Sequence, residues 1–134
     1  MQHDRRYTLI CGGLTLSYSA ERWSRYSAEF AEFQQLVKAA AGRVIYLGGD
    51  IHKNAFGAPS ATGTPPCYEI ISSGACVNYL GLPFEFDCRR NWTLLELSAT
   101  EVRVNQHDKK GITRYRIEPA SWQYQALGRA LRAA

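Results

Sequence analysis

Two side chains that can bind a metal ion follow a glycine pair near the middle of the chain. The segment Gly48-Gly49-Asp50-Ile51-His52 places an aspartate and a histidine two residues apart. On an extended or turning backbone, alternate residues can point the same way, so this carboxylate and this imidazole can bind the same metal ion. An oxygen and an imidazole nitrogen together suit Zn, Fe or Mn. On spacing alone, the alternative is a capping Asp50 beside a His52 held by ordinary hydrogen bonds.

A βαβ unit is predicted to position this segment. The apolar run 43–47 directly before it predicts a strand buried on both faces, and the run 7–11 predicts a parallel partner strand. Between them, residues 19–41 predict a helix capped by Ser19. Ligands bind at the carboxyl ends of strands in open α/β sheets, which is where Asp50 and His52 fall. The helix has one apolar face, which is expected to pack as core: Trp23, Tyr26, Phe30, Phe33, Leu36, Val37 and Ala40.

The second half of the chain changes to short strands with tight turns. A hairpin turn is predicted at Asp108-Lys109-Lys110-Gly111, and a short terminal helix at 121–131. Residues 54–66 predict a loop, and residues 75–90 have no regular pattern. The fold class is therefore α/β or α+β, with a βαβ unit, an antiparallel meander and a mixed sheet. Strands are predicted at 68–72, 92–97, 101–106 and 112–117.

The composition is that of a folded protein that does not cross a membrane. Of the 134 residues, 46% are hydrophobic and 21% are charged, and no run approaches the ~18 apolar residues of a membrane span. We expect one domain, no membrane association and, because the first residues lack a secretory signal, a cytoplasmic location. The net charge of +4 comes from scattered basic residues, so a nucleic-acid partner is not expected. The basic pairs at 5–6, 89–90 and 109–110 are expected to be solvated.

The four cysteines have no C-x-x-C spacing. Cys11 lies in an apolar run and is predicted to be a buried free thiol. A zinc site formed by Cys67, Cys76 and Cys88 is a weaker alternative, because the gaps between them are long and irregular.

The wider context of the Asp50–His52 segment resembles a PhoD-type (alkaline phosphatase D-like) phosphatase of the calcineurin-like metallophosphoesterase superfamily. Residues 44–52 are similar to the family's strand followed by G-D-x-H, and the helix beginning near Trp23 is similar to the helix before that strand. Residues 68–74 are similar to the family's E-x-x-S-S-G strand. Residues 91–97 are similar to the strand after it, where Thr93 replaces a common glycine. The matches occur in family order, from about residue 7 to residue 117.

The resemblance implies a phosphoesterase that hydrolyses phosphate mono- or diesters with two divalent metal ions. Such ions clamp the phosphate and activate a water molecule. Asp50 and His52 would be metal ligands, His52 would also be the catalytic residue, and Asn54 would bind phosphate, with Lys53 also within reach of it. The metals stay open among Fe, Mn, Zn and Ca. In relatives outside the PhoD branch the residue matching Asp50 is commonly histidine, so the oxygen ligand favours a harder ion such as Ca or Mn.

The early ligand motifs of that superfamily are missing from this sequence. Neither G-D-x-x-D nor G-N-H-[DE] occurs before Tyr46, and His3 and His107 are expected to be solvated. Two ligands cannot hold a dinuclear centre. We therefore expect residues 1–134 to be the C-terminal part of a PhoD-like metallophosphatase domain, inactive alone. Its partners would be a phosphate ester and the missing N-terminal half, or a second copy, because exposed apolar faces favour self-association.

Two other functions are open. The second hypothesis is a non-catalytic interaction subunit or remnant without bound metal, which the missing ligands favour. The third is a basic nucleic-acid-binding module, against which the lack of a basic stripe counts. Metal bound through Asp50 and His52 would separate the first hypothesis from the second, and a steep salt dependence of DNA or RNA affinity would support the third.

Overall fold

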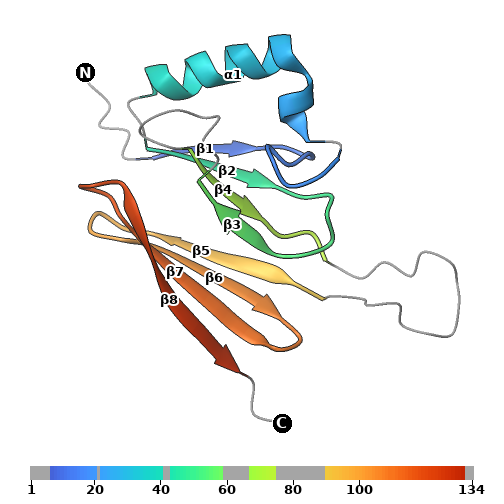
Figure 1. Cartoon of the computed structure of the whole chain (residues 1–134). Helices are drawn as coiled ribbons and strands as arrows, with labels where there is room; N and C mark the ends of the chain where they lie inside the picture. Colours follow the sequence, from blue (N-terminus) through green and yellow to red (C-terminus); the bar gives the residue numbers. More distant parts are fainter. Residues whose placement is uncertain (1–6, 21, 41–42, 59–66, 75–89, 132–134) are drawn as a thin grey trace, which may run out of the picture.

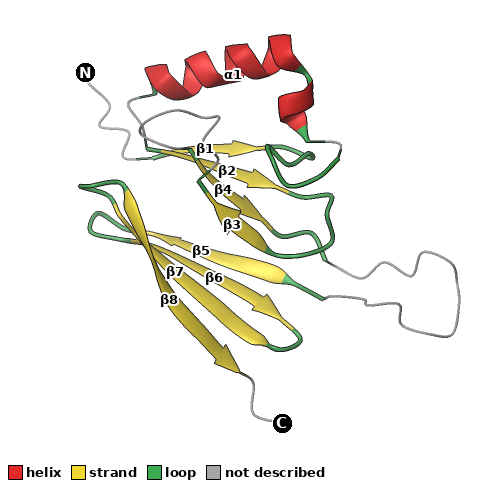
Figure 2. Ribbon diagram, in the orientation of Figure 1, coloured by secondary structure: helices red, strands yellow, loops and turns green. Residues whose placement is uncertain are grey.

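Three layers make up the part of the chain that the computed structural model describes, which is residues 7–20, 22–40, 43–58, 67–74 and 90–131. Within these residues the strands form two four-stranded sheets, sheet A in the order β1-β2-β4-β3 and sheet B in the order β5-β6-β7-β8. Helix α1 covers one face of sheet A, and sheet B packs against the other (Figures 1 and 2). The fold is therefore mixed α/β and made mostly of strands.

Sheet A contains the predicted βαβ unit. β1 (Thr8–Cys11), α1 (Ser27–Ala39) and β2 (Val44–Gly48) follow one another, and β1 and β2 run parallel. β4 (Tyr68–Ile71) continues the parallel pairing beside β2. At the edge, β3 (Ala55–Gly57) runs antiparallel to β4, which makes the sheet mixed, as predicted. The prediction of loop for 54–66 missed β3, because three residues are too few for a periodic pattern and pairing with β4 decides their conformation.

Sheet B is the predicted antiparallel meander. It consists of β5 (Trp92–Leu97), β6 (Val102–Asp108), β7 (Gly111–Glu118) and β8 (Gln123–Leu131). The hairpin turn at 108–111 is confirmed, since the Asp108 carboxylate accepts bonds from the backbone N–H groups of Lys110 and Gly111 at 2.7 and 3.1 Å.

The helix predicted over residues 121–131 is wrong, because this segment forms β8. β7 offers a partner along its whole length, from Glu118 opposite Gln123 to Gly111 opposite Leu131. Such long-range pairing outweighs a weak local helical preference. A bulge near Arg114 lets β8 follow β7, and Gly128 nearby has φ +89°.

Helix α1 begins at Ser27 rather than at Ser19. The preceding residues form a 3-10 turn, η1 (Trp23–Arg25), whose amides are held by the loop after β1. The Trp23 N–H donates to the Thr15 carbonyl at 2.7 Å, so a contact with the loop replaces the first helical turns. Ser19 therefore does not cap α1.

The apolar face of α1 is only partly buried. Phe30, Phe33 and Val37 pack against β2, where Val44 and Tyr46 point toward the helix. Two other members of the predicted face, Tyr26 and Leu36, are exposed. The buried part of this face thus has packing partners among the described residues, and the rest of the face is exposed.

The second core lies between the two sheets. Ile45, Tyr68 and Ile70 of sheet A meet the inward-facing side chains of sheet B, among them Val104 and Ile117. Alternate residues of a strand point to opposite faces, so β2 contributes to both cores. The turn between β7 and β8 closes one end: Trp122 is buried there, and its carbonyl accepts a 2.9 Å bond from the Tyr68 hydroxyl. No helix in the described segments is long and apolar enough to cross a membrane.

The cysteines differ from the prediction at one position. Cys11 is exposed rather than buried, because β1 is the edge strand of sheet A. Cys67 lies in the core beneath α1, where burial raises the pKa of its thiol to about 12. The other two members of the proposed zinc set, Cys76 and Cys88, fall outside the described residues.

Candidate functional site

The loop that carries Asp50 and His52 has a constrained backbone. It follows β2 directly, at the carboxyl end of a parallel strand, as predicted. Asp50 has φ 73° and His52 has φ 52°, both in the left-handed region. That conformation costs a residue other than glycine roughly 1–2 kcal/mol, and such strain concentrates at functional sites. Asp50 is exposed, and His52 is half-buried.

Asn91, just before β5, fixes this loop against the end of β4. Its side-chain N–H donates to the His52 carbonyl at 3.2 Å. Its side-chain oxygen accepts from the backbone N–H groups of Ser73 and Gly74 at 3.2 and 3.1 Å. The His52 N–H in turn donates to the Ser73 hydroxyl at 3.0 Å. Asn91 is 6% exposed, so these bonds are sheltered from water.

Asn54 joins the same loop to sheet B. Its side-chain oxygen accepts from the Ser72 hydroxyl at 2.9 Å, and its N–H group donates to the His107 carbonyl at 2.8 Å. Beside it, the Gln106 side chain donates to the carbonyls of Ala55 and Ile71 at 2.9 and 3.2 Å. Asn54 therefore connects the two sheets along their shared boundary, which we call the seam. Its predicted contact with phosphate stays a prediction.

The glycine pair before the loop serves packing within the protein. A Cβ on Gly48 would lie 2.6 Å from the Ile71 side chain and 2.8 Å from the Leu14 carbonyl. No side chain fits at that spacing without displacing backbone. A Cβ on Gly49 would lie 3.4 Å from the Ser73 side chain, which is close to ordinary contact. The missing side chain at Gly48 therefore lets β2 approach its own neighbours in the protein.

The described residues supply the right donor types for a metal ion, but too few of them. Asp50 and His52 offer an oxygen and an imidazole nitrogen, as expected. No group of three or more His, Cys, Asp or Glu side chains in the described segments could hold a metal ion. A structural zinc site takes four ligands, and a catalytic one takes three from the protein. Asp50 and His52 together thus supply fewer ligands than either kind of zinc site takes.

Glu69 is a buried carboxylate that the sequence interpretation left without a role. It lies in the middle of β4 and is fully buried. It accepts hydrogen bonds from the Leu16 N–H at 2.5 Å and from the Ser17 hydroxyl at 2.9 Å. Burial raises the pKa of Glu69, although the hydrogen bonds from Leu16 and Ser17 act in the opposite direction. Its contacts fasten the loop after β1 to sheet A.

A basic pocket of about 340 Å³ adjoins the Asp50–His52 loop. The sequence interpretation treated the Lys109-Lys110 pair as solvated turn charges and placed Arg129 on a helix, so it could not assemble this pocket. The pairing of β7 with β8 puts Thr113 opposite Arg129, and the Arg129 guanidinium forms an ion pair with Asp108. The lining residues are Lys53, Asn54, Asn91, Asp108, Lys109, Lys110 and Arg129.

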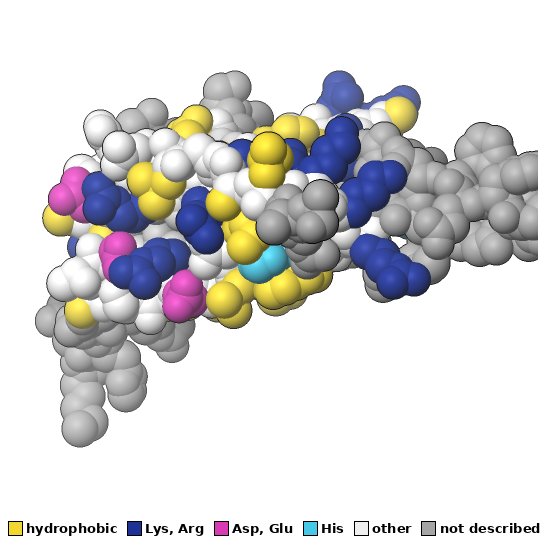
Figure 3. All heavy atoms as spheres, turned by 90° about the horizontal axis from the view of Figure 1, so that it is seen from below, with side chains coloured by type: hydrophobic (Ala, Val, Ile, Leu, Met, Phe, Trp, Pro, Cys, Tyr) yellow, Lys and Arg dark blue, Asp and Glu magenta, His cyan; other side chains and the backbone are white. Residues whose placement is uncertain are grey.

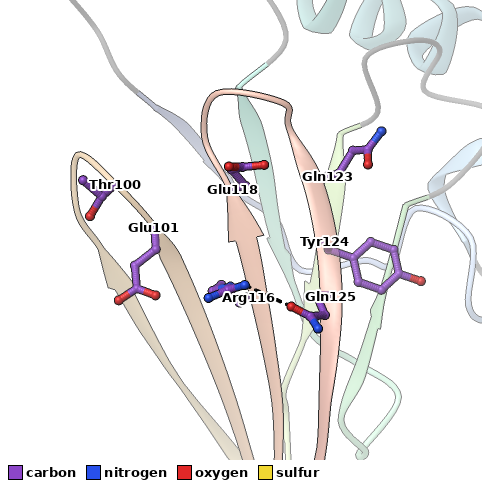
Figure 4. Close-up of a pocket in the computed structure, with 7 residues that line it drawn as sticks. All are labelled: Thr100, Glu101, Arg116, Glu118, Gln123, Tyr124 and Gln125. Atoms are coloured by element: carbon purple, nitrogen blue, oxygen red, sulfur yellow. Dashed lines mark hydrogen bonds between the residues drawn. The ribbon is translucent and has the colours of Figure 1, made fainter.

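A larger depression of about 450 Å³ lies at the other end of sheet B (Figure 4). Its charged side chains are engaged with neighbours in the protein: Glu118 accepts from Ser121 at 2.6 Å, and Arg116 donates to Gln125 at 3.0 Å. Glu101 forms an ion pair with Arg103. Among its described lining residues, two carboxylates and one guanidinium leave a net charge of only −1, and each charged group already has a partner within the protein.

The outer face of sheet B mixes apolar side chains with basic and acidic ones (Figure 3). Trp92 is 51% exposed and Leu94 is 46% exposed. The His107 ring stacks on Trp92 with 3.7 Å between ring centroids and 7° between planes. The sequence interpretation expected His107 to be solvated. In the structure it is half-buried against an aromatic neighbour.

No protein-family model matches this chain, and no curated protein sequence matches it.

Proposed function

We propose that this chain contributes Asp50 and His52 to the metal centre of a phosphoesterase whose remaining ligands come from outside the described residues. The observation that carries the proposal is the loop itself. Two side chains of metal-ligand type, Asp50 and His52, follow a parallel strand, both with left-handed backbone, and part-buried hydrogen bonds hold the His52 backbone in place. A rigid supporting shell is what a metal-ligand loop requires. The similarity of residues 44–52 to the PhoD-type motif supports the same function.

The chemistry of the proposal is hydrolysis of a phosphate mono- or diester. Bound metal ions would supply a Lewis acid for the phosphate and a water activated as nucleophile. Within this chain, Asp50 and His52 would hold metal, and the Asn91 contacts would fix the position of His52. The chain alone is then expected to bind metal weakly and to hydrolyse no phosphate ester.

A titration with Mn²⁺ tests the proposal on the chain as it is. Paramagnetic broadening should concentrate in the NMR signals of Asp50 and His52, and it should disappear in Asp50→Asn and His52→Asn. Asparagine tolerates the left-handed backbone, so these variants remove the ligand without adding strain. The matched control is His107→Asn, which removes a histidine elsewhere and should leave the broadening unchanged. Broadening that survives in both loop variants would contradict the proposal.

The second candidate function is a non-catalytic interaction protein, favoured by the exposed Trp92 and Leu94 on sheet B. Clustered apolar side chains on a surface mark contact sites when they form a patch. The expected occupant is a second copy of the chain. Analytical ultracentrifugation should then show a mass that rises with concentration and falls to the monomer in Leu94→Ser. A constant monomer mass in the unmodified chain would remove this candidate.

A further inference from the structure

The basic pocket beside the Asp50–His52 loop has a charge excess that the proposed metal centre does not use. Among the described residues, its lining holds four cationic side chains and one carboxylate, that of Asp108, which leaves a net charge of +3. Its volume of about 340 Å³ lies within the range of roughly 300–1,000 Å³ that is usual for small-molecule sites. The β2–β3 loop supplies Lys53, and the β6–β7 turn supplies Lys109 and Lys110.

The one carboxylate in the pocket is already committed to the protein. Asp108 accepts from the backbone N–H groups of Lys110 and Gly111 and from the Arg129 guanidinium. Partial burial raises the pKa of Asp108, but these hydrogen bonds and the Arg129 charge outweigh it and leave the pKa below its ordinary value. The ionised Asp108 thereby fixes Arg129 at the pocket wall. A guanidinium has five N–H donors, so this contact leaves others for a ligand.

Two further lining residues are held in place by hydrogen bonds within the protein. Asn54 and Asn91 line the pocket, and both side chains are held by the seam between the sheets. A site whose walls are ordered before binding loses less conformational entropy when a ligand enters. The exposed lysines Lys53 and Lys110 can then close on a ligand from two separate elements.

We propose that this pocket binds a phosphate group, as inorganic phosphate or as the phosphate of a small ester, without a metal ion. Lysine and arginine donors converging on one cavity match the charge and the several acceptor oxygens of phosphate. None of the cationic residues is a ligand of the proposed metal centre. A result against phosphate binding in this pocket therefore does not count against the metal centre, and the reverse also holds.

The test is an NMR titration of inorganic phosphate into the full chain, at low ionic strength and with EDTA present. We expect saturable binding of one phosphate, with the largest shifts at the backbone amides of Lys53, Asn54 and Lys110. Replacing both lysines, Lys53→Gln with Lys110→Gln, should raise the dissociation constant at least about tenfold, the factor that 1.4 kcal/mol produces. Both side chains are exposed, so the fold should persist, which circular dichroism would check.

The control variant carries the same loss of charge away from the pocket. Arg22→Gln with Lys38→Gln removes two exposed cations from the α1 side of the molecule and should leave the affinity within about twofold, because neither side chain lines the pocket. Absence of saturable binding, or equal weakening in both double variants, would overturn the proposal. Because EDTA excludes metal, phosphate binding that fails while Mn²⁺ still broadens His52 removes this inference alone. The opposite pattern removes only the proposed metal centre.

Discussion

Asn91 is expected to be the most sensitive polar position of the candidate site. Replacing it by alanine deletes a side chain that is 6% exposed and accepts from the backbone N–H groups of Ser73 and Gly74. It also deletes the donor to the His52 carbonyl. A sheltered backbone group left without a partner costs roughly 1–3 kcal/mol. Three groups are orphaned here, and the lower end of that range for each group gives an expected loss of about 3 kcal/mol in the free energy of unfolding for Asn91→Ala.

Urea denaturation followed by circular dichroism and by tryptophan fluorescence measures this loss, provided both probes give one transition. The matched control is Asn105→Ala, which removes the same side chain from sheet B, where it donates to Glu96 in an exposed hydrogen bond. That change should cost less than about 0.5 kcal/mol. Hydrogen exchange should also become faster at the Ser73 and Gly74 amides in Asn91→Ala. If the two alanine variants lose the same stability, the role assigned to Asn91 is refuted.

Three further predictions concern Gly48, Glu69 and the two described cysteines. Gly48→Ala should destabilise the protein by about 1–3 kcal/mol, because the new methyl group meets backbone and Ile71; an unfolding midpoint equal to that of the unmodified chain would contradict this. The raised pKa of Glu69 means that the folded state holds its proton more tightly than the unfolded state, so the stability that this group contributes is present below its ordinary pKa of 4.5 and is lost as pH rises through the folded pKa. Glu69→Gln should flatten this decline in urea titrations between pH 4 and pH 8, and an unchanged slope would exclude Glu69 as its source. Cys11 should react rapidly with a thiol reagent and Cys67 slowly, because one is exposed and the other is buried with a pKa of about 12. Measured in a chain that carries Cys76→Ser and Cys88→Ser, loss of the fast phase in Cys11→Ser would verify the assignment, and its persistence would contradict it.

Local patterns were sufficient to predict much of the fold. The apolar runs at 7–11 and 43–47 flank a segment with helical spacing, and the structure confirms a parallel βαβ unit there. The hairpin at 108–111 was equally readable, because Asp and Gly supply the turn contacts themselves. Such signals lie within a few residues of each other and need no knowledge of the rest of the chain.

The errors in the predicted elements share a physical cause, which is a partner that lies outside the segment itself. β8 forms because β7 offers it an edge, and β3 forms because β4 does. The start of α1 is displaced because the Trp23 N–H donates to the loop after β1. That loop is itself held by Glu69, which is 53 residues from Leu16 and 52 residues from Ser17. The conformations of these three segments could not be predicted from their own residues.

The candidate site divides in the same way. The position of Asp50 and His52 after a buried strand was predicted from the sequence. The left-handed φ of both residues, and the Asn91 contact 39 positions from His52, were not predictable. The basic pocket needed β8 to be a strand before Arg129 could join Asp108.

The two sheets also differ in the order in which they can form. Sheet B joins neighbouring segments by hairpins, whereas sheet A pairs Thr8 with Val44 across a helix. Closing a long loop costs more entropy, so contacts between nearby residues form sooner. We expect β6 and β7 to gain protection first in a pulse-labelled refolding experiment, and β1 later; the reverse order would contradict this. The His52 N–H group donates to Ser73, which follows sheet A, and both residues are bonded by Asn91, which precedes sheet B. We therefore expect the His52 amide to be protected last. The segment proposed to bind metal would then acquire its shape only after the two sheets have packed together.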